Sequence, residues 1–268
     1  MFKQYYHMSY NPFSKQVKDK DIYQTEDLKQ VHGRLDHLKN TGGIGLITAE
    51  PGVGKTFALR TWRNKQNQNS TKFVYICMSS VTNREFYIEL CNGLGVIPRW
   101  KKSDLFQDIQ NCIKVLADER RMKVVICIDE AQYLPSSILK DLQMITNFDM
   151  DSRDLVSIIL AGHSMLNKQI SRQPFESLQQ RLIVNYQLEG LTEEQTNDYV
   201  QTQLSRVGAD PNLFSEAAII SAASFAGRSI RKLNSIITNA FTIAAQKQVN
   251  SITPEIVQNA TDELLLCN

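Results

Sequence analysis

The feature that most constrains this chain is a glycine-rich loop set between an apolar run and a helix-forming segment. Residues 44–47 are apolar or small, residues 49–56 read Ala-Glu-Pro-Gly-Val-Gly-Lys-Thr, and residues 57–62 favour a helix. Strand, loop and helix in this order are the context of a Walker A phosphate loop, in which small residues let main-chain N–H groups close around phosphate. A plain surface turn is the alternative, but such a turn does not need Gly-Lys-Thr at this offset.

The chemistry of the loop follows from its last residues. Lys55 can reach the β- and γ-phosphate oxygens of ATP, and Thr56 can place its hydroxyl on Mg²⁺ at a helix N-terminus. Ala49 stands where Gly is usual, and Ala tolerates every backbone region except positive φ. We therefore predict a nucleotide-binding set made up of Glu50, Pro51, Gly52, Val53, Gly54, Lys55, Thr56 and Phe57.

A second motif is typical of the same chemistry. Residues 124–128 are apolar and rich in β-branched side chains, as in a buried strand, and they run into Asp129 and Glu130. In phosphate-loop enzymes an acidic residue at the tip of a neighbouring strand binds Mg²⁺, and a second carboxylate can polarise the attacking water. We predict these roles for Asp129 and Glu130 on the strand next to the loop strand; a simple helix start is the alternative. Residues 129–132 also echo a helicase motif, but 268 residues are too few for two helicase lobes.

Composition limits the possible partners. The formal net charge is only +2, so any nucleic-acid contact has to come from local basic clusters. Neither a signal sequence nor an apolar run of the ~18 residues that span a bilayer is present, which predicts a soluble, cytoplasmic protein. No C-x-x-C spacing occurs among the cysteines, which we interpret as reduced core thiols: Cys77, Cys91, Cys112, Cys127 and Cys267.

The order of apolar runs predicts an α/β fold with a parallel five-stranded sheet covered by helices on both faces. The expected strands are 44–47, 73–77, 124–128, 156–160 and 182–186. Between and before them we expect helices at about 25–38 and at 83–94, one capped by Ser103 and one opened by Pro135.

From residue 191 the pattern contains helices alone. Residues 192–195 form a capping box, and further helices are expected near 213–225, 229–246 and 254–265. This change predicts an N-terminal segment at 1–40, a nucleotide-binding α/β domain at 41–190 and a small all-helical lid at 191–268.

Five further polar residues are candidates for three roles at the phosphate. The strand ending at Leu160 should lie beside the loop strand, so His163 or Ser164 can sense the γ-phosphate; an ordinary cap or loop histidine is the alternative. Arg181 can serve a neighbouring subunit as an arginine finger, or it can be a surface cation at a helix end. Arg228 or Arg231 can couple a lid helix to the nucleotide, or both can belong to a solvated basic face.

Taken together, these residues resemble AAA+ ATPases, and among them the ExeA/TniB-type group that includes transposon helper ATPases. The matching segments are 11–13, 49–56, the strand into 129–132, 160–163, 178–181 and 227–234. The resemblance implies Lys55 and Thr56 on phosphate and Mg²⁺, Asp129 on Mg²⁺, Glu130 as general base, a sensor near His163, Arg181 as a trans-acting finger and Arg231 as lid sensor. His163 replaces the usual Asn or Thr, and Ile230 precedes Arg231 where Pro is frequent.

Within that group, secretion-type ATPases carry a membrane span and an envelope domain after the ATPase module, whereas transposition helpers are compact, as here. The resemblance implies a homo-oligomer, in a ring or filament, that assembles with ATP on duplex DNA and recruits or activates a DDE transposase or integrase. Candidate DNA contacts are 99–102 and 120–123, which can also be solvated charged loops. Helicase loading, replication initiation and a nucleotide-gated scaffold with little turnover are the alternative functions.

Overall fold

The computed structural model describes residues 2–14, 21–77 and 82–266 and divides the chain into two compact units. The sheet unit comprises Lys29–Glu50 and Lys55–Leu188. The helical unit comprises Met1–Leu28, Pro51–Gly54 and Glu189–Asn268. The sequence predicts residues 1–40 as one segment, whereas the structure divides these residues between the two units.

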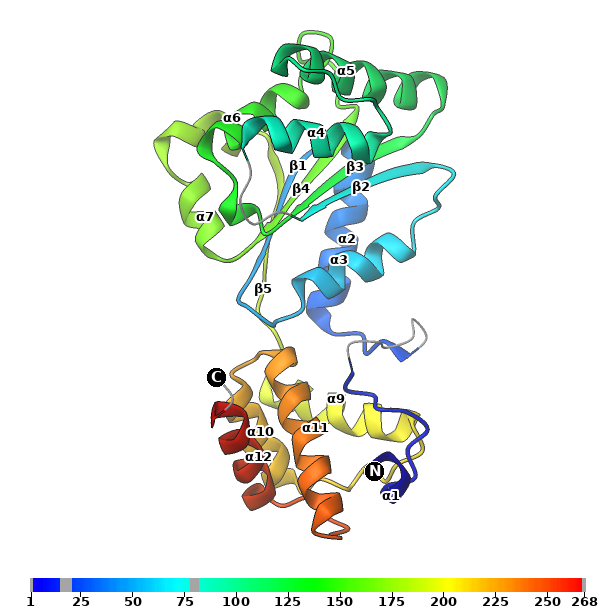
Figure 1. The fold of residues 1–268 in the computed structure, drawn as a ribbon, viewed down its shortest axis with the longest axis vertical. Coiled ribbons are helices and arrows are strands. Elements are labelled where there is room, and N and C mark those ends of the chain that lie inside the picture. The colour runs from blue at the N-terminus through cyan, green and yellow to red at the C-terminus, as the bar shows by residue number, and fades with distance from the viewer. Residues whose placement is uncertain (1, 15–20, 78–81, 267–268) are drawn as a thin grey trace. The chain divides into compact units, whose positions relative to one another are not determined.

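The sheet unit is built on five parallel strands in the order β2-β3-β4-β1-β5, which confirms the predicted fold class (Figure 1). The strands are β1 (Gly43–Ala49), β2 (Thr71–Cys77), β3 (Lys123–Asp129), β4 (Val156–Gly162) and β5 (Leu182–Leu188). Every residue of β1 and β4 is buried, whereas β2 and β5 are edge strands with partly exposed side chains.

The strand register tests two predictions about neighbours. The strand that leads to His163 does lie beside the loop strand, with Thr48 of β1 opposite Gly162 of β4. The prediction that the Asp129 strand is next to the loop strand is wrong, because β4 pairs with both β3 and β1 and so separates them. Asp129 therefore reaches the loop across one intervening strand.

Helices cover both faces of the sheet (Figure 1). On one face, alternate apolar residues of β1 to β4 share a core with α4 (Asn83–Leu94), α5 (Lys102–Lys114) and α6 (Ser136–Ile145). Three short elements add side chains to the same core: α7 (Met165–Ile170), η4 (Gln173–Phe175) and α8 (Glu176–Gln179). On the other face lie α2 (Glu26–Thr41) and α3 (Lys55–Asn64). The Ser157 hydroxyl of β4 donates to the Leu38 carbonyl of α2 over 2.9 Å.

Local signals explain some of the helix ends. Thr82 caps α4 in a capping box, and Gly95 ends it with a left-handed φ of 87°. The predicted cap at Ser103 is wrong: α5 starts at Lys102, its N-cap residue is Lys101, and no side chain caps it. Apolar spacing still places Leu105, Ile109 and Ile113 in the core. After α5 the chain continues as a π-helix, η2 (Val115–Glu119).

The C-terminal part of the helical unit contains α9 (Glu193–Arg206), α10 (Glu216–Ala226), α11 (Ile230–Gln246) and α12 (Pro254–Leu266). The predicted capping box is present, since Thr192 accepts from the Gln195 main chain and the Gln195 side chain accepts from Thr192. None of the helices in the described ranges is long and apolar enough to cross a membrane.

The N-terminal segment packs on these helices through aromatic rings. The ring of Phe2, in α1 (Phe2–Tyr5), stacks on Phe241 of α11 at a centroid distance of 5.6 Å. Phe13 lies 6.0 Å from Phe241 and meets Tyr199 edge to face at 5.9 Å. Asn11 shapes the turn, because its side-chain oxygen accepts from the Phe13 N–H. The Asn-Pro-Phe sequence thus anchors the chain start in the helical core.

The cysteines within the described ranges are free thiols. Cys91 and Cys127 are buried and Cys112 is half-buried, whereas Cys77 is exposed because it ends an edge strand. Burial raises the pKa of the Cys91 thiol to about 11, so it is an unreactive core residue. Cys267 lies outside the described residues.

Candidate functional site

The glycine-rich loop connects β1 to α3 with the backbone that the Walker A reading requires. Gly52 and Gly54 have φ values of 85° and 120°, a region that side chains disfavour. Ala49 is the last residue of β1 and is not among the positive-φ residues, so the missing first glycine is tolerated as expected. Lys55 and Thr56 open α3 and bring their side chains to a helix N-terminus.

Asp129, at the end of β3, gathers the predicted phosphate and magnesium residues. Its side chain is 2% exposed and lies 3.1 Å from the Lys55 ammonium. The Thr56 hydroxyl donates to Asp129 Oδ2 over 2.8 Å, and the Tyr75 hydroxyl donates to the same oxygen over 3.0 Å. Burial and the nearby carboxylate raise the pKa of Tyr75, so its hydroxyl stays protonated and continues to donate.

The oxygen atoms of Asp129 and Thr56 fit a magnesium ion bound together with a nucleotide. A carboxylate and a hydroxyl oxygen 2.8 Å apart are the hard ligands that Mg²⁺ takes in phosphate-loop sites. Within the described ranges no group of three acidic, histidine or cysteine side chains converges. The remaining ligands would therefore be phosphate oxygens and water, which is how Mg²⁺ is usually held.

Glu130 follows in a strained conformation with a φ of 57°. Its N–H donates to Asp129 Oδ1 over 2.9 Å, and its side chain is 41% exposed. The Glu130 carboxylate lies 3.5 Å from the Lys55 ammonium and accepts a 2.7 Å hydrogen bond from Gln132 Nε2. An accessible carboxylate is a group that can accept a proton from a water molecule.

The tip of β4 carries both candidate sensors, and both contact the same loop residue. His163 Nε2 lies 3.0 Å from Glu50 Oε2, and the Ser164 hydroxyl donates to Glu50 Oε1. The Ser164 hydrogen bond is the main cause that lowers the pKa of Glu50. Glu50 is thus turned toward the β4 tip, and His163 and Ser164 remain equal candidates.

The arginines have different surroundings. Arg181, just before β5, donates through both terminal nitrogens to the Asp151 carboxylate over 2.7 and 2.8 Å, and its side chain is 25% exposed. In the helical unit, Arg228 lies 3.3 Å from Glu189. The Arg231 N–H donates to the Gly52 carbonyl over 3.1 Å. Of the two lid candidates, Arg231 is the one whose main chain contacts the phosphate loop.

Comparison with known proteins agrees with this geometry. Residues 38–170 match the AAA domain family. These residues form an AAA domain with the P-loop of AAA+ ATPases. It is 28% identical over 251 residues to general secretion pathway protein A of Aeromonas hydrophila, a match that covers 91% of this chain and 45% of that protein. The chain thus spans less than half of that relative's length.

Solved structures share the fold of this chain. Cdc6p of Pyrobaculum aerophilum matches with a TM-score of 0.68 at 18% identity, covering 97% of this chain and 70% of that one. The Aeropyrum pernix ORC1 protein, solved in complex with DNA, matches at 0.65 and 16% identity, covering 94% and 68%. The RuvB branch migration motor of Thermotoga maritima matches at 0.55 and 15% identity, covering 94% and 73%.

The first basic cluster is partly neutralised by acidic side chains. Arg99 binds Asp108, and Lys102 binds Asp141. In the second cluster, the Lys123 ammonium donates to the Asn40 carbonyl over 3.3 Å. Trp100 is exposed, and the Arg84 guanidinium lies 4.4 Å from its ring centroid. Asp141 lies 39 positions from Lys102 in the sequence, so composition alone could not reveal this pair.

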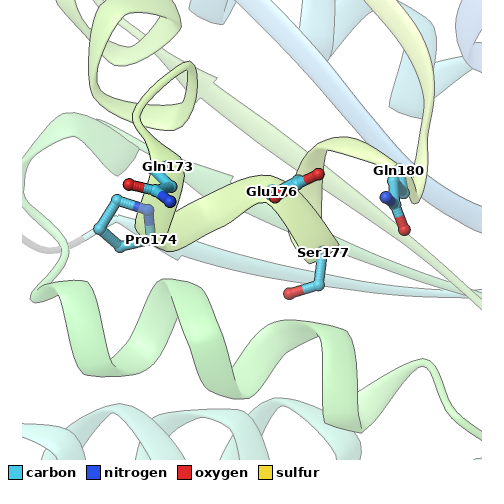
Figure 2. A pocket seen from close by; sticks show the side chains of 5 residues that line it. All are labelled: Gln173, Pro174, Glu176, Ser177 and Gln180. Carbon is cyan, nitrogen blue, oxygen red and sulfur yellow. The ribbon is translucent and has the colours of Figure 1, made fainter.

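A shallow polar depression lies along η4 and α8 (Figure 2). Its lining residues are Gln173, Pro174, Glu176, Ser177 and Gln180. The Walker residues contribute nothing to it, and its only charged group is one carboxylate. It therefore has no means of binding a triphosphate.

Two residues of the site, Tyr75 and Gln132, were not predicted. The Tyr75 hydroxyl reaches Asp129 because β2 pairs with β3, which places Cys77 opposite Asp129. Gln132 reaches Glu130 through a local turn, η3 (Ala131–Tyr133). The signal for Tyr75 is an aromatic residue near the end of the strand preceding Walker B, and that for Gln132 is an amide two positions after the base.

Proposed function

We propose that this ATPase hydrolyses Mg-ATP as a switch, with the main chain of residues 50–56 around the phosphates and Glu130 as general base. The observation that carries the proposal is that the Asp129 carboxylate lies 3.1 Å from the Lys55 ammonium and 2.8 Å from the Thr56 hydroxyl. Lys55 neutralises phosphate charge, and Thr56 and Asp129 hold the metal. Bound Mg²⁺ supplies Lewis-acid neutralisation of the phosphate oxygens.

The proposed partner is duplex DNA, on which the protein assembles as a homo-oligomer and recruits or activates a transposase. Support comes from the resemblance of its motifs to transposon helper ATPases and from the fold shared with an ORC1 protein solved on DNA. A role in secretion is the second candidate, because a secretion pathway protein is 28% identical over 91% of this chain. Helicase loading or replication initiation would share the chemistry and differ in the partner recovered by affinity purification.

Duplex DNA is expected to stimulate phosphate release, and the stimulation should fall steeply as salt rises. Binding through phosphate contacts releases counterions, so the logarithm of affinity falls linearly with the logarithm of salt concentration. Because Arg99 and Lys102 already have acidic partners, Lys101→Ala should lower the salt slope more than Lys102→Ala. Phosphate release is measured with and without duplex at several salt concentrations. A rate that DNA leaves unchanged at every salt concentration contradicts the DNA role and favours the secretion candidate or a scaffold.

Arg181→Ala is expected to slow ATP hydrolysis about 100-fold, because a preorganised cation opposite the transferred phosphate is lost. Mixing this variant with Lys55→Ala subunits should restore part of the rate, since the second subunit contributes its arginine and the first contributes its phosphate loop. Steady-state phosphate release of the two variants, alone and mixed, is the measurement.

The control for Arg181 is Asp151→Asn, which breaks the same ion pair and keeps the arginine. A surface pair contributes about 0–1 kcal/mol, so neither variant should unfold the protein. Asp151→Asn should hydrolyse ATP at least as fast as the parent, because Arg181 is free to leave. Loss of activity in both variants, or no recovery on mixing, would rule out a shared site.

A further inference from the structure

The side chain of Gln132 joins the proposed base to the tip of the sensor strand. Its Nε2 donates to Glu130 Oε2 over 2.7 Å, and its Oε1 accepts the His163 N–H over 3.0 Å. Gln132 lies on η3, whereas His163 follows β4, so one amide links two separate segments of the sheet unit. The hydrolysis mechanism above gives this amide no role.

The direction of the amide is fixed by its two neighbours. The His163 main-chain N–H can only donate, so the Gln132 oxygen must face it. The remaining NH₂ group then faces Glu130, whose ionised carboxylate can only accept. A flipped amide would place two acceptors together and two donors together. The bridge therefore has one orientation.

Glu130 needs an external anchor. Its φ of 57° is costly for a non-glycine residue, and a 41% exposed side chain has few packing contacts to select a rotamer. In this structure the carboxylate is 3.5 Å from the Lys55 ammonium, a group that phosphate is expected to attract away. The Gln132 hydrogen bond does not depend on the lysine.

Gly162 provides the space for the amide. A Cβ atom at this position would lie 2.5 Å from Gln132 Oε1 and 3.0 Å from the Leu166 side chain. The φ angle of Gly162 is not positive, so its backbone conformation does not require glycine. A methyl group here would push the amide aside and leave the backbone of β4 unstrained.

We propose that Gln132 is a positioning residue that ties the Glu130 carboxylate to the main chain at the tip of β4 and so holds it in line for the attacking water. This inference rests on the proposed role of Glu130 as general base. The same tip contacts the start of the phosphate loop through His163 and Glu50, so the base and the loop share one anchor. Misplacing a reacting group by about 1 Å can cost up to about 100-fold in rate.

Gln132→Met keeps the length of the side chain and removes both hydrogen bonds without adding charge. We expect turnover at saturating ATP to fall about tenfold or more while the Kd for Mg-ATP stays within about twofold. Turnover is measured by phosphate release and Kd by calorimetry. Gln110→Met is the matched control, because the Gln110 amide also joins two points of the sheet unit, donating to the Met144 and Asn147 carbonyls, and lies outside the site.

A double-mutant cycle tests whether Gln132 acts through Glu130. In single-turnover reactions with labelled ATP, Gln132→Met should slow the parent but not Glu130→Gln, because the group that Gln132 positions is already disabled. Gly162→Ala should reproduce the loss of turnover while every Gln132 atom is still present. If Gln132→Met misfolds, the turnover of Gly162→Ala alone tests the proposal.

The proposal is overturned if Gln132→Met and Gly162→Ala turn over within about twofold of the parent, if the loss appears in Kd, or if Gln132→Met slows Glu130→Gln by the same factor. These outcomes leave the proposed function intact whenever Glu130→Gln itself is slow. Hydrolysis by Glu130→Gln at the parental rate would instead defeat the assignment of the base, and with it the role of Gln132.

Discussion

Glu130→Gln is expected to bind Mg-ATP as tightly as the parent and to hydrolyse it about 1,000-fold more slowly, within the range that general-base catalysis contributes. The substitution removes the basic oxygen but keeps the size of the side chain. Lys55, Thr56 and Asp129, which are placed to hold phosphate and metal, are unchanged. The variant should therefore accumulate in the ATP-bound assembled state.

Two measurements separate binding from turnover in this variant. Calorimetry gives the Kd for Mg-ATP, and phosphate release gives the rate; size-exclusion chromatography in ATP should show an oligomer that persists after the parental one has dispersed. Glu119→Gln makes the same chemical change at an exposed residue that ends η2 and should match the parent. A parental hydrolysis rate in Glu130→Gln would show that another group activates water.

The central residues of the site could be predicted from the sequence because short local motifs encode their chemistry. A loop that needs two left-handed residues needs glycine at 52 and 54, and a lysine and threonine must follow at a helix start. The apolar run that ends in Asp129 likewise predicts a parallel strand and marks its carboxyl end. The first residues of helices were harder to predict, as Ser103 shows, because tertiary packing decides at which residue a helix begins.

Pairings between distant segments could not be predicted. Nothing in residues 123–129 says that β4 separates their strand from β1, since the order of parallel strands is decided by how the helical crossovers pack. The acidic partners of Lys102 and Arg181 follow from that packing, and so does the contact of Gln132 with His163. The two residues of each of these contacts can be paired only once the fold is known.

Lys55→Ala is expected to abolish ATP binding at ordinary concentrations. Lys55 should make two charge-assisted hydrogen bonds to phosphate, and losing about 2 kcal/mol for each raises Kd about 1,000-fold. Calorimetry with Mg-ATP is the measurement. Lys55→Arg keeps the charge but replaces a compact ammonium with a larger planar group, so it should recover only part of the affinity. Tight binding by Lys55→Ala would show that the loop is not the phosphate site.

The same substitution should also destabilise the protein without nucleotide. Asp129 is 2% exposed and loses the cation 3.1 Å away, and an uncompensated buried charge costs about 3 kcal/mol or more. Lys55→Ala/Asp129→Asn removes that charge while keeping an oxygen that Thr56 and Tyr75 can still reach. Thermal unfolding should therefore show the double variant melting above Lys55→Ala, although neither binds ATP. Equal melting temperatures would mean that Asp129 does not depend on the lysine, and that the pair is held together by the fold rather than by charge.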